Sequence, residues 1–86
     1  MGLHKDVIEL LNSFDWPGVN TAMLHVNDRK EISYKFRILC EKGIRYNRGE
    51  IEAEIELHHS DWADSVKEEV VNIAEIMEYS FEYGKS

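Results

Sequence analysis

The sequence predicts an α+β fold of the order α-β-β-β-α, in which an antiparallel three-stranded sheet packs against two helices in a single two-layer domain, residues 1–86. Two observations predict the sheet, because apolar and polar residues alternate strictly in Glu50–Leu57 and through most of Glu31–Lys42. A third observation predicts the helices, since apolar residues recur every three or four positions in Leu3–Phe14 and in Trp62–Glu82.

The first helix is expected over Leu3–Phe14. Asp6 stands in its early turns, where the helix dipole favours an acid. Trp16-Pro17-Gly18 should end this helix, because the residue before a proline disfavours the helical conformation and glycine lets the chain turn. The apolar face of the helix consists of Leu3, Val7, Leu10, Leu11 and Phe14.

Two strands are expected next, Val19–Val26 and Glu31–Lys42, joined by a turn at Asn27-Asp28-Arg29-Lys30. The connection that follows, Gly43–Gly49, either closes a tight hairpin at Tyr46–Gly49 or forms a looser loop, and parity allows both registers. In each register Lys35 and Arg37 share a face with the glutamates of the third strand. The side chains of the second strand that should face the core are Ile32, Tyr34, Phe36, Ile38 and Cys40.

The third strand, Glu50–Leu57, is the clearest element of the predicted sheet. Ile51, Ala53, Ile55 and Leu57 alternate with four glutamates without a break, so they should face the core while the glutamates face water. Glutamate and alanine favour helices over strands. A helix, however, would spread the glutamates around its circumference, and we therefore expect the period-2 pattern to prevail over propensity.

The last helix is expected over Trp62–Glu82, with Gly84 just beyond its end. Its apolar stripe should be buried, and an acidic side should face water. The stripe consists of Trp62, Val66, Val70, Ile73, Ala74, Met77 and Phe81, and the acidic side of Asp64, Glu68, Glu75, Glu78 and Glu82.

Charge is distributed unevenly along this chain of net charge −7. Residues 29–48 hold seven basic and two acidic residues, whereas residues 50–82 hold eleven acidic residues and one lysine. The two blocks either neutralise each other across neighbouring strands, or the acidic block faces a basic partner. A single cysteine, no signal-peptide pattern and no long apolar run lead us to expect a cytoplasmic protein without membrane contact.

The sequence contains no pattern that predicts catalysis, a metal site or a cofactor. His58 and His59 are neighbours on an expected strand end and should point to opposite sides, so they do not form a metal site. Cys40 should lie on the inner face of the sheet, where a free cysteine behaves as a small apolar residue. We expect a protein that is not an enzyme, with no catalytic residue, no metal and no cofactor.

The acidic row favours binding of another protein. Alternate residues on a strand are about 6.5–7 Å apart, close to the phosphate repeat of one nucleic-acid strand, so the row resembles a short phosphate backbone. The expected partner is a protein with a basic, nucleic-acid-binding surface. In general character the chain resembles the small acidic inhibitors that phages and mobile elements direct against host nucleases, toxins or CRISPR effectors. The expected partner-binding residues are Glu50, Glu52, Glu54, Glu56, Asp64, Glu68, Tyr79 and Tyr83, although the two tyrosines alternatively cover the sheet edge.

An alternative function is an RNA- or single-strand-binding module that uses the basic hairpin. The predicted order of elements is similar to that of the double-stranded RNA-binding domain, but the start of the last helix, where that family carries lysines, reads Ser60-Asp61-Trp62-Ala63-Asp64 and is acidic. A third possibility is a homodimer through an open sheet edge. The residues expected to contact nucleic acid are Arg29, Lys30, Lys42, Arg45, Tyr46 and Arg48.

Overall fold

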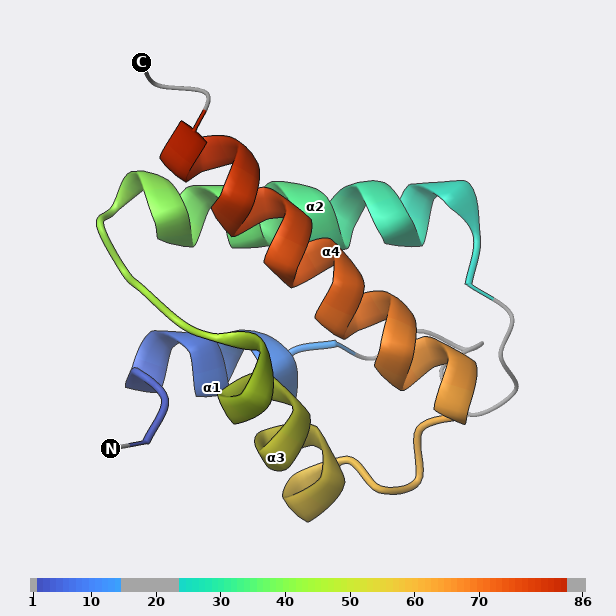
Figure 1. Cartoon of the computed structure of the whole chain (residues 1–86). Helices are drawn as coiled ribbons and strands as arrows, with labels where there is room; N and C mark the ends of the chain where they lie inside the picture. Colours follow the sequence, from blue (N-terminus) through green and yellow to red (C-terminus); the bar gives the residue numbers. More distant parts are fainter. Residues whose placement is uncertain (1, 15–23, 84–86) are drawn as a thin grey trace.

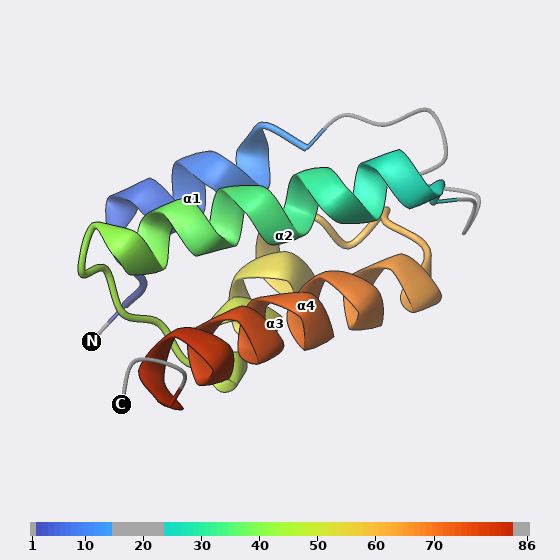
Figure 2. The same ribbon diagram turned by 90° about the horizontal axis from the view of Figure 1, so that it is seen from above.

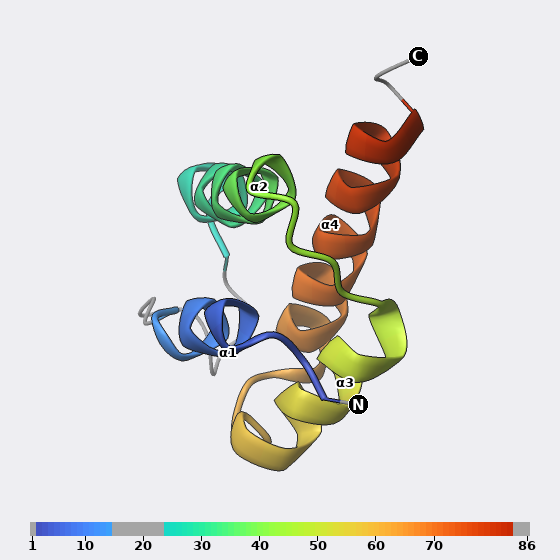
Figure 3. The same cartoon turned by 90° about the vertical axis from the view of Figure 1, so that its left-hand side faces the viewer.

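The computed structural model describes residues 2–14 and 24–83, and this part of the chain contains four helices (Figure 1). The helices are α1 (Lys5–Asn12), α2 (Val26–Glu41), α3 (Arg48–His58) and α4 (Asp64–Tyr83). They form two layers, with α1 and α2 in one and α3 and α4 in the other, as two further views show (Figures 2 and 3). The fold is therefore all-helical.

The predicted α+β fold is wrong, because the described residues contain no strand. The second and third predicted strands are helices α2 and α3, and the predicted turn Asn27–Lys30 lies inside α2. Residues 19–23 of the predicted first strand and Trp16-Pro17-Gly18 lie outside the described residues. The two outer helices are confirmed, since α1 lies within Leu3–Phe14 and α4 closely follows Trp62–Glu82.

The helical conformation of α2 is explained by the spacing of its buried apolar residues, which also fits the alternation expected of a strand at most positions. Its buried side chains recur at the helical positions i, i+4, i+7 and i+8, namely Ile32, Phe36, Leu39 and Cys40. Three of these four positions also have the parity of a strand. The positions that fit only one of the two periods favour the helix: Leu39, on the outer face of the predicted strand, is buried, and Tyr34, expected inside, is 65% exposed. Ile38, also expected inside, is only half-buried.

Both ends of α2 carry hydrogen bonds typical of helix termini. The backbone N–H of His25 donates to Asp28 Oδ2 at 3.0 Å. At the other end Gly43 adopts a φ of +84°, and the N–H groups of Gly43 and Ile44 donate to the carbonyls of Cys40 and Leu39. This pair of bonds is a Schellman motif, which favours glycine because only glycine enters the left-handed conformation at little cost.

Helix α3 keeps only half of the predicted inner face. Ile51 and Ile55, one helical turn apart, are buried, whereas Ala53 and Leu57 are exposed. The side chain of Asn47 accepts a hydrogen bond from the N–H of Glu50 at 2.9 Å and caps the first turn. Two isoleucines at i and i+4 are enough to attach a short helix to the core, so the helix-forming glutamates prevail over the alternation.

The core is organised by aromatic side chains that reach across both layers. The ring centroids of Phe36 lie 6.3 Å from Phe14 and 5.4 Å from Tyr46, and Phe14 lies 6.4 Å from Trp62. The hydroxyl of Tyr46 donates a hydrogen bond to the carbonyl of Ala74 in α4 at 2.8 Å. The Sγ atom of Cys40, which is buried as predicted, lies 3.5 Å from the hydroxyl oxygen of Tyr46. The connection between α2 and α3 is thereby attached to α4.

Candidate partner-binding groove between α3 and α4

Conversion of the predicted strand to a helix divides the glutamate row into two pairs. Ile51 and Ile55 occupy the inner face of α3, so helical geometry places Glu52 and Glu56 on the flank next to α4 and Glu50 and Glu54 on the opposite flank. The phosphate-like row with a spacing of about 6.5–7 Å therefore does not exist. In its place, each flank presents two carboxylates about 6 Å apart along the helix axis.

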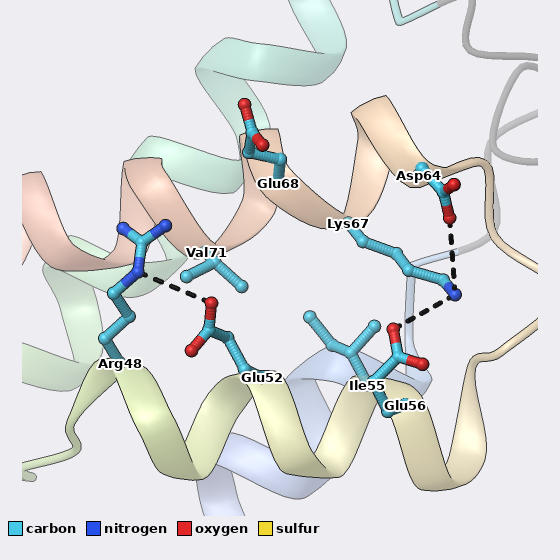
Figure 4. A pocket seen from close by; sticks show the side chains of 8 residues that line it. All are labelled: Arg48, Glu52, Ile55, Glu56, Asp64, Lys67, Glu68 and Val71. Carbon is cyan, nitrogen blue, oxygen red and sulfur yellow. Dashed lines mark hydrogen bonds and ion pairs between the residues drawn. The ribbon is translucent and has the colours of Figure 1, made fainter.

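The flank next to α4 opens into a groove of about 440 Å³. The side chains of Ile55 and Val71 lie at its base, and charged side chains from both helices surround them (Figure 4). Four of these residues are acidic and two are basic. The acids are Glu52, Glu56, Asp64 and Glu68, and the bases are Arg48 and Lys67.

The two bases of this α3–α4 groove are already engaged. Nε of Arg48 lies 3.5 Å from Glu52, and its Nη1 lies 3.0 Å from Glu75. Nζ of Lys67 lies 3.2 Å from Glu56 and 3.8 Å from Asp64. Each base therefore contacts two carboxylates, and the charges of the acids are only partly neutralised.

Glu68 differs from the other acids of the groove. It forms no ion pair or hydrogen bond with the described residues, and its side chain is exposed above the groove (Figure 4). Asp64 is also fully exposed at the start of α4, where only the 3.8 Å contact with Lys67 partly compensates its charge. This end of the groove is therefore the most accessible to an added cation.

The groove has the composition of a binding site for cationic side chains. Its carboxylates accept charge-assisted hydrogen bonds, and its apolar base accommodates the hydrocarbon part of a lysine or arginine. No cysteine, histidine, serine or threonine lines it. Among the described residues there is also no group of three or more His, Cys, Asp or Glu side chains placed to hold a metal ion.

The other predicted partner-binding residues lie elsewhere. Glu50 and Glu54 border a smaller cavity of about 200 Å³ near the N-terminus, which Leu3 and Leu57 also line. Tyr79 and Tyr83 lie together near the C-terminal end of α4, with ring centroids 4.5 Å apart. The structure therefore brings together four of the eight predicted residues in one groove.

The basic set predicted for nucleic-acid binding does not form one surface. Tyr46 is buried in the core, so its ring is not available to stack on a base. Arg29 pairs with Glu69 at 2.6 Å, and Arg45 pairs with Glu82 at 3.4 Å. Arg48 is held in the α3–α4 groove, while Lys30 and Lys42 are exposed near opposite ends of α2. The basic hairpin that was to carry these residues does not exist.

Three residues of the groove were not predicted as site residues, namely Ile55, Lys67 and Val71. Ile55 was predicted only as a core residue, and the sequence contained a signal for Lys67. Lys67 is the single base among eleven acids in residues 50–82, which marks it as an internal counter-charge. Val71 is not part of the predicted apolar stripe of α4, yet it is buried. Its position is explained only by α3 packing against that side of α4.

Comparison with known proteins gives no relative for this arrangement. No family model matches the chain, and neither a curated protein nor a solved structure matches it. Within the part of the chain that the structure describes, no helix has the length and apolar character needed to cross a membrane.

Proposed function

We propose that this chain is a small acidic binding protein that covers a basic surface of another protein. The observation that carries the proposal is the α3–α4 groove, in which Glu52, Glu56, Asp64 and Glu68 surround an apolar base. Acidic surfaces of this kind complement the lysine- and arginine-rich surfaces with which proteins hold phosphates. The function is occlusion of such a surface.

Lys67 indicates how a basic side chain of the partner fits. Only 14% of the Lys67 side chain is exposed, and its ammonium group still reaches both Glu56 and Asp64. A lysine or arginine of the partner would use the same arrangement, with its hydrocarbon stem on Ile55 and Val71 and its charge among the carboxylates. The unpaired Glu68 supplies the next acceptor.

The charge that remains on α3 and α4 supports the proposal at longer range. Ion pairs from the basic block reach residues of the acidic block through three side chains, Arg29, Arg45 and Arg48. The eleven acids of residues 50–82 are therefore only partly neutralised within the chain. Such a surface attracts a basic partner, accelerates association and makes binding sensitive to salt.

The proposed target is a nuclease, a toxin or a CRISPR effector in the cytoplasm of a host cell. These proteins hold nucleic acid on basic surfaces, and a compact acidic protein that masks such a surface competes with the phosphate backbone. This part of the proposal rests on the general character that the chain shares with the inhibitors of phages and mobile elements. It requires that nucleic acid and this chain cannot bind the target at the same time.

Capture of partners from a lysate of the native host tests the proposal, because α3 offers a matched control. The groove variant is Glu52→Gln with Glu56→Gln, and the control variant is Glu50→Gln with Glu54→Gln on the opposite flank. Both remove two charges from the same helix. Each protein is immobilised at low salt in a nuclease-treated lysate, its folding is checked by circular dichroism, and the retained proteins are identified by mass spectrometry.

We expect the wild type and the control variant to retain the same basic protein. The groove variant should lose it by roughly ten-fold, which corresponds to about 1.4 kcal/mol, and added DNA or RNA should displace it from the wild type. Equal loss from both variants would show that only total charge matters. Full retention by the groove variant, or nucleic acid that co-elutes without displacing the protein, would contradict the proposal.

A further inference from the structure

Lys67 already occupies the position in the α3–α4 groove that suits a basic side chain of a partner. Its side chain starts on α4 and crosses the groove, so that Nζ lies 3.2 Å from Glu56 on α3 and 3.8 Å from Asp64 on α4 (Figure 4). A lysine or arginine of another protein cannot take the same place while Lys67 is there, because two cations in one site repel each other.

The contacts that hold the ammonium group of Lys67 are weak. An ammonium group has three N–H donors, and the one hydrogen bond that Lys67 donates to a described residue goes to Glu56. The side chain of Glu56 is 68% exposed, and that of Asp64 is fully exposed. Ion pairs with such carboxylates contribute little, because water solvates both charges and salt screens them. Lys67 can therefore leave this position at little cost.

The release of Lys67 does not require a helix to move. Asp64 lies three residues before Lys67 on α4, so the two side chains are neighbours on the surface of one helix. Glu56 belongs to the facing helix. Rotation about the flexible four-carbon stem of Lys67 keeps the ammonium group near Asp64 and frees Glu56. Glu56 can then accept an external cation.

Arg48, the other base of the groove, is held differently. Its Nη1 donates hydrogen bonds to Asn72 at 2.8 Å and to Glu75 at 3.0 Å, both on α4. Its Nε lies 3.5 Å from Glu52 on its own helix. The planar guanidinium group is therefore fixed by three side chains and links α3 to α4. Of the two bases, Lys67 is the one that can be displaced.

We propose that Lys67 is an internal competitor for the α3–α4 groove, and that a basic side chain of the partner displaces it from Glu56. The inference rests on the proposed function and adds a residue that sets its affinity. Glu68, which forms no ion pair with the described residues, receives the first cation of the partner. The next cation replaces Lys67. In the free protein the contact of Lys67 with Glu56 is thus autoinhibitory.

The fluorescence anisotropy of a labelled hexalysine peptide tests the proposal at about 0.15 M salt, where charges more than about 8 Å apart are largely screened. Lys67→Met keeps the hydrocarbon stem and removes the charge. The matched control is Lys42→Met, the same substitution at an exposed lysine that directly follows α2 and does not line the groove. The two variants have the same net charge. Circular dichroism verifies folding, and Lys67→Gln repeats the measurement with a second uncharged side chain.

The groove glutamates provide a second control. Lys67→Met is also introduced into the groove variant, Glu52→Gln with Glu56→Gln, which lacks the carboxylate for which the two cations compete. The affinity for hexalysine in this background shows whether a gain caused by Lys67→Met arises in the groove.

We expect Lys67→Met to bind hexalysine about three-fold more tightly than the wild type, or better. Lys42→Met should stay within about 1.5-fold of the wild type, and the gain should disappear in the groove variant. A purely structural role of Lys67 would leave the affinity of Lys67→Met unchanged or lower it, which would overturn the proposal. Equal gains in Lys67→Met and Lys42→Met, or a gain that persists without the groove glutamates, would overturn it as well.

Failure of this inference is distinguishable from failure of the proposed function. If the wild type and Lys67→Met bind hexalysine equally and the groove variant does not bind it, the competition is wrong and the groove remains a site for cations. If neither the wild type nor Lys67→Met binds hexalysine, the cationic occupant that the proposed function requires is contradicted too.

Discussion

Helix α4 has two sides that differ in what they contribute. On the side that packs against α2, Val70 and Ala74 are fully buried in the same apolar core as Phe36. On the side that faces α3, charged side chains surround an open groove, and Arg48 and Lys67 are shared among more acids than they can neutralise. The first side accounts for the fold. The ion pairs of the second side are partly exposed, so we expect its charge to change with little effect on folding, which is the property that a binding surface needs.

The largest expected effect comes from breaking the apolar side. Phe36→Ala removes a fully buried ring that contacts Phe14 and Tyr46, and we expect it to lower the free energy of unfolding by about 3–5 kcal/mol. Urea denaturation followed by circular dichroism measures this change. Leu57→Ala, which shortens an exposed side chain on α3, is the control and should stay within about 0.5 kcal/mol. Similar losses in the two variants would contradict the comparison.

A smaller effect is expected from Tyr46→Phe, which keeps the ring and removes the hydroxyl that donates to Ala74. Loss of this buried hydrogen bond should lower the free energy of unfolding by about 1–2 kcal/mol at pH 7. Denaturation of the wild type and the variant under the same conditions measures the difference. No loss at all would show that the hydrogen bond does not help attach the α2–α3 connection to α4.

The same variant should change the response to alkaline pH. Burial, followed by the hydrogen bond with Cys40, raises the pKa of Tyr46 above its ordinary value of 10.0. The unfolded chain therefore ionises this tyrosine first, so its contribution to stability is complete below pH 10 and is lost as the pH rises above that value. The wild type should lose more stability between pH 9 and 11 than Tyr46→Phe. Equal losses would contradict the raised pKa.

The smallest effect is expected from Lys67→Met in the α3–α4 groove. The substitution keeps the hydrocarbon stem over the apolar base and removes the charge shared by Glu56 and Asp64. Ion pairs of partly exposed side chains contribute little, so the free energy of unfolding should change by less than about 1 kcal/mol. A loss as large as that of Phe36→Ala would show that the charged side of α4 is also essential for folding.

The sequence predicted the outer helices and missed the inner ones for a definable reason. In α1 and α4 the apolar residues follow only the helical period, whereas Ile32, Phe36 and Cys40 fit a strand equally well. The capping signals decide such cases: Asn47 three positions before Glu50, and Gly43 directly after the last turn of α2. Weighing these local signals above the alternation would have predicted both helices.

The candidate site was predictable in its charge and not in its arrangement. The acidic character of residues 50–82 is evident in the sequence, and four of the predicted residues do share one groove. Which glutamates face α4 depends on the helical conformation of α3. In the predicted strand all four glutamates would lie on one face. The burial of Tyr46 depends on a carbonyl 28 residues away, which no local pattern contains.

The position of Cys40 has a consequence for the chemistry of the chain. Its thiol is the only one in the sequence, and it is fully buried beside the Tyr46 hydroxyl. Oxidants and alkylating reagents act on exposed thiolates, so they reach this sulfur only when α2 separates from its neighbours. The rate at which the thiol is modified therefore reports the opening of the molecule, and a folded population resists covalent cross-linking through sulfur.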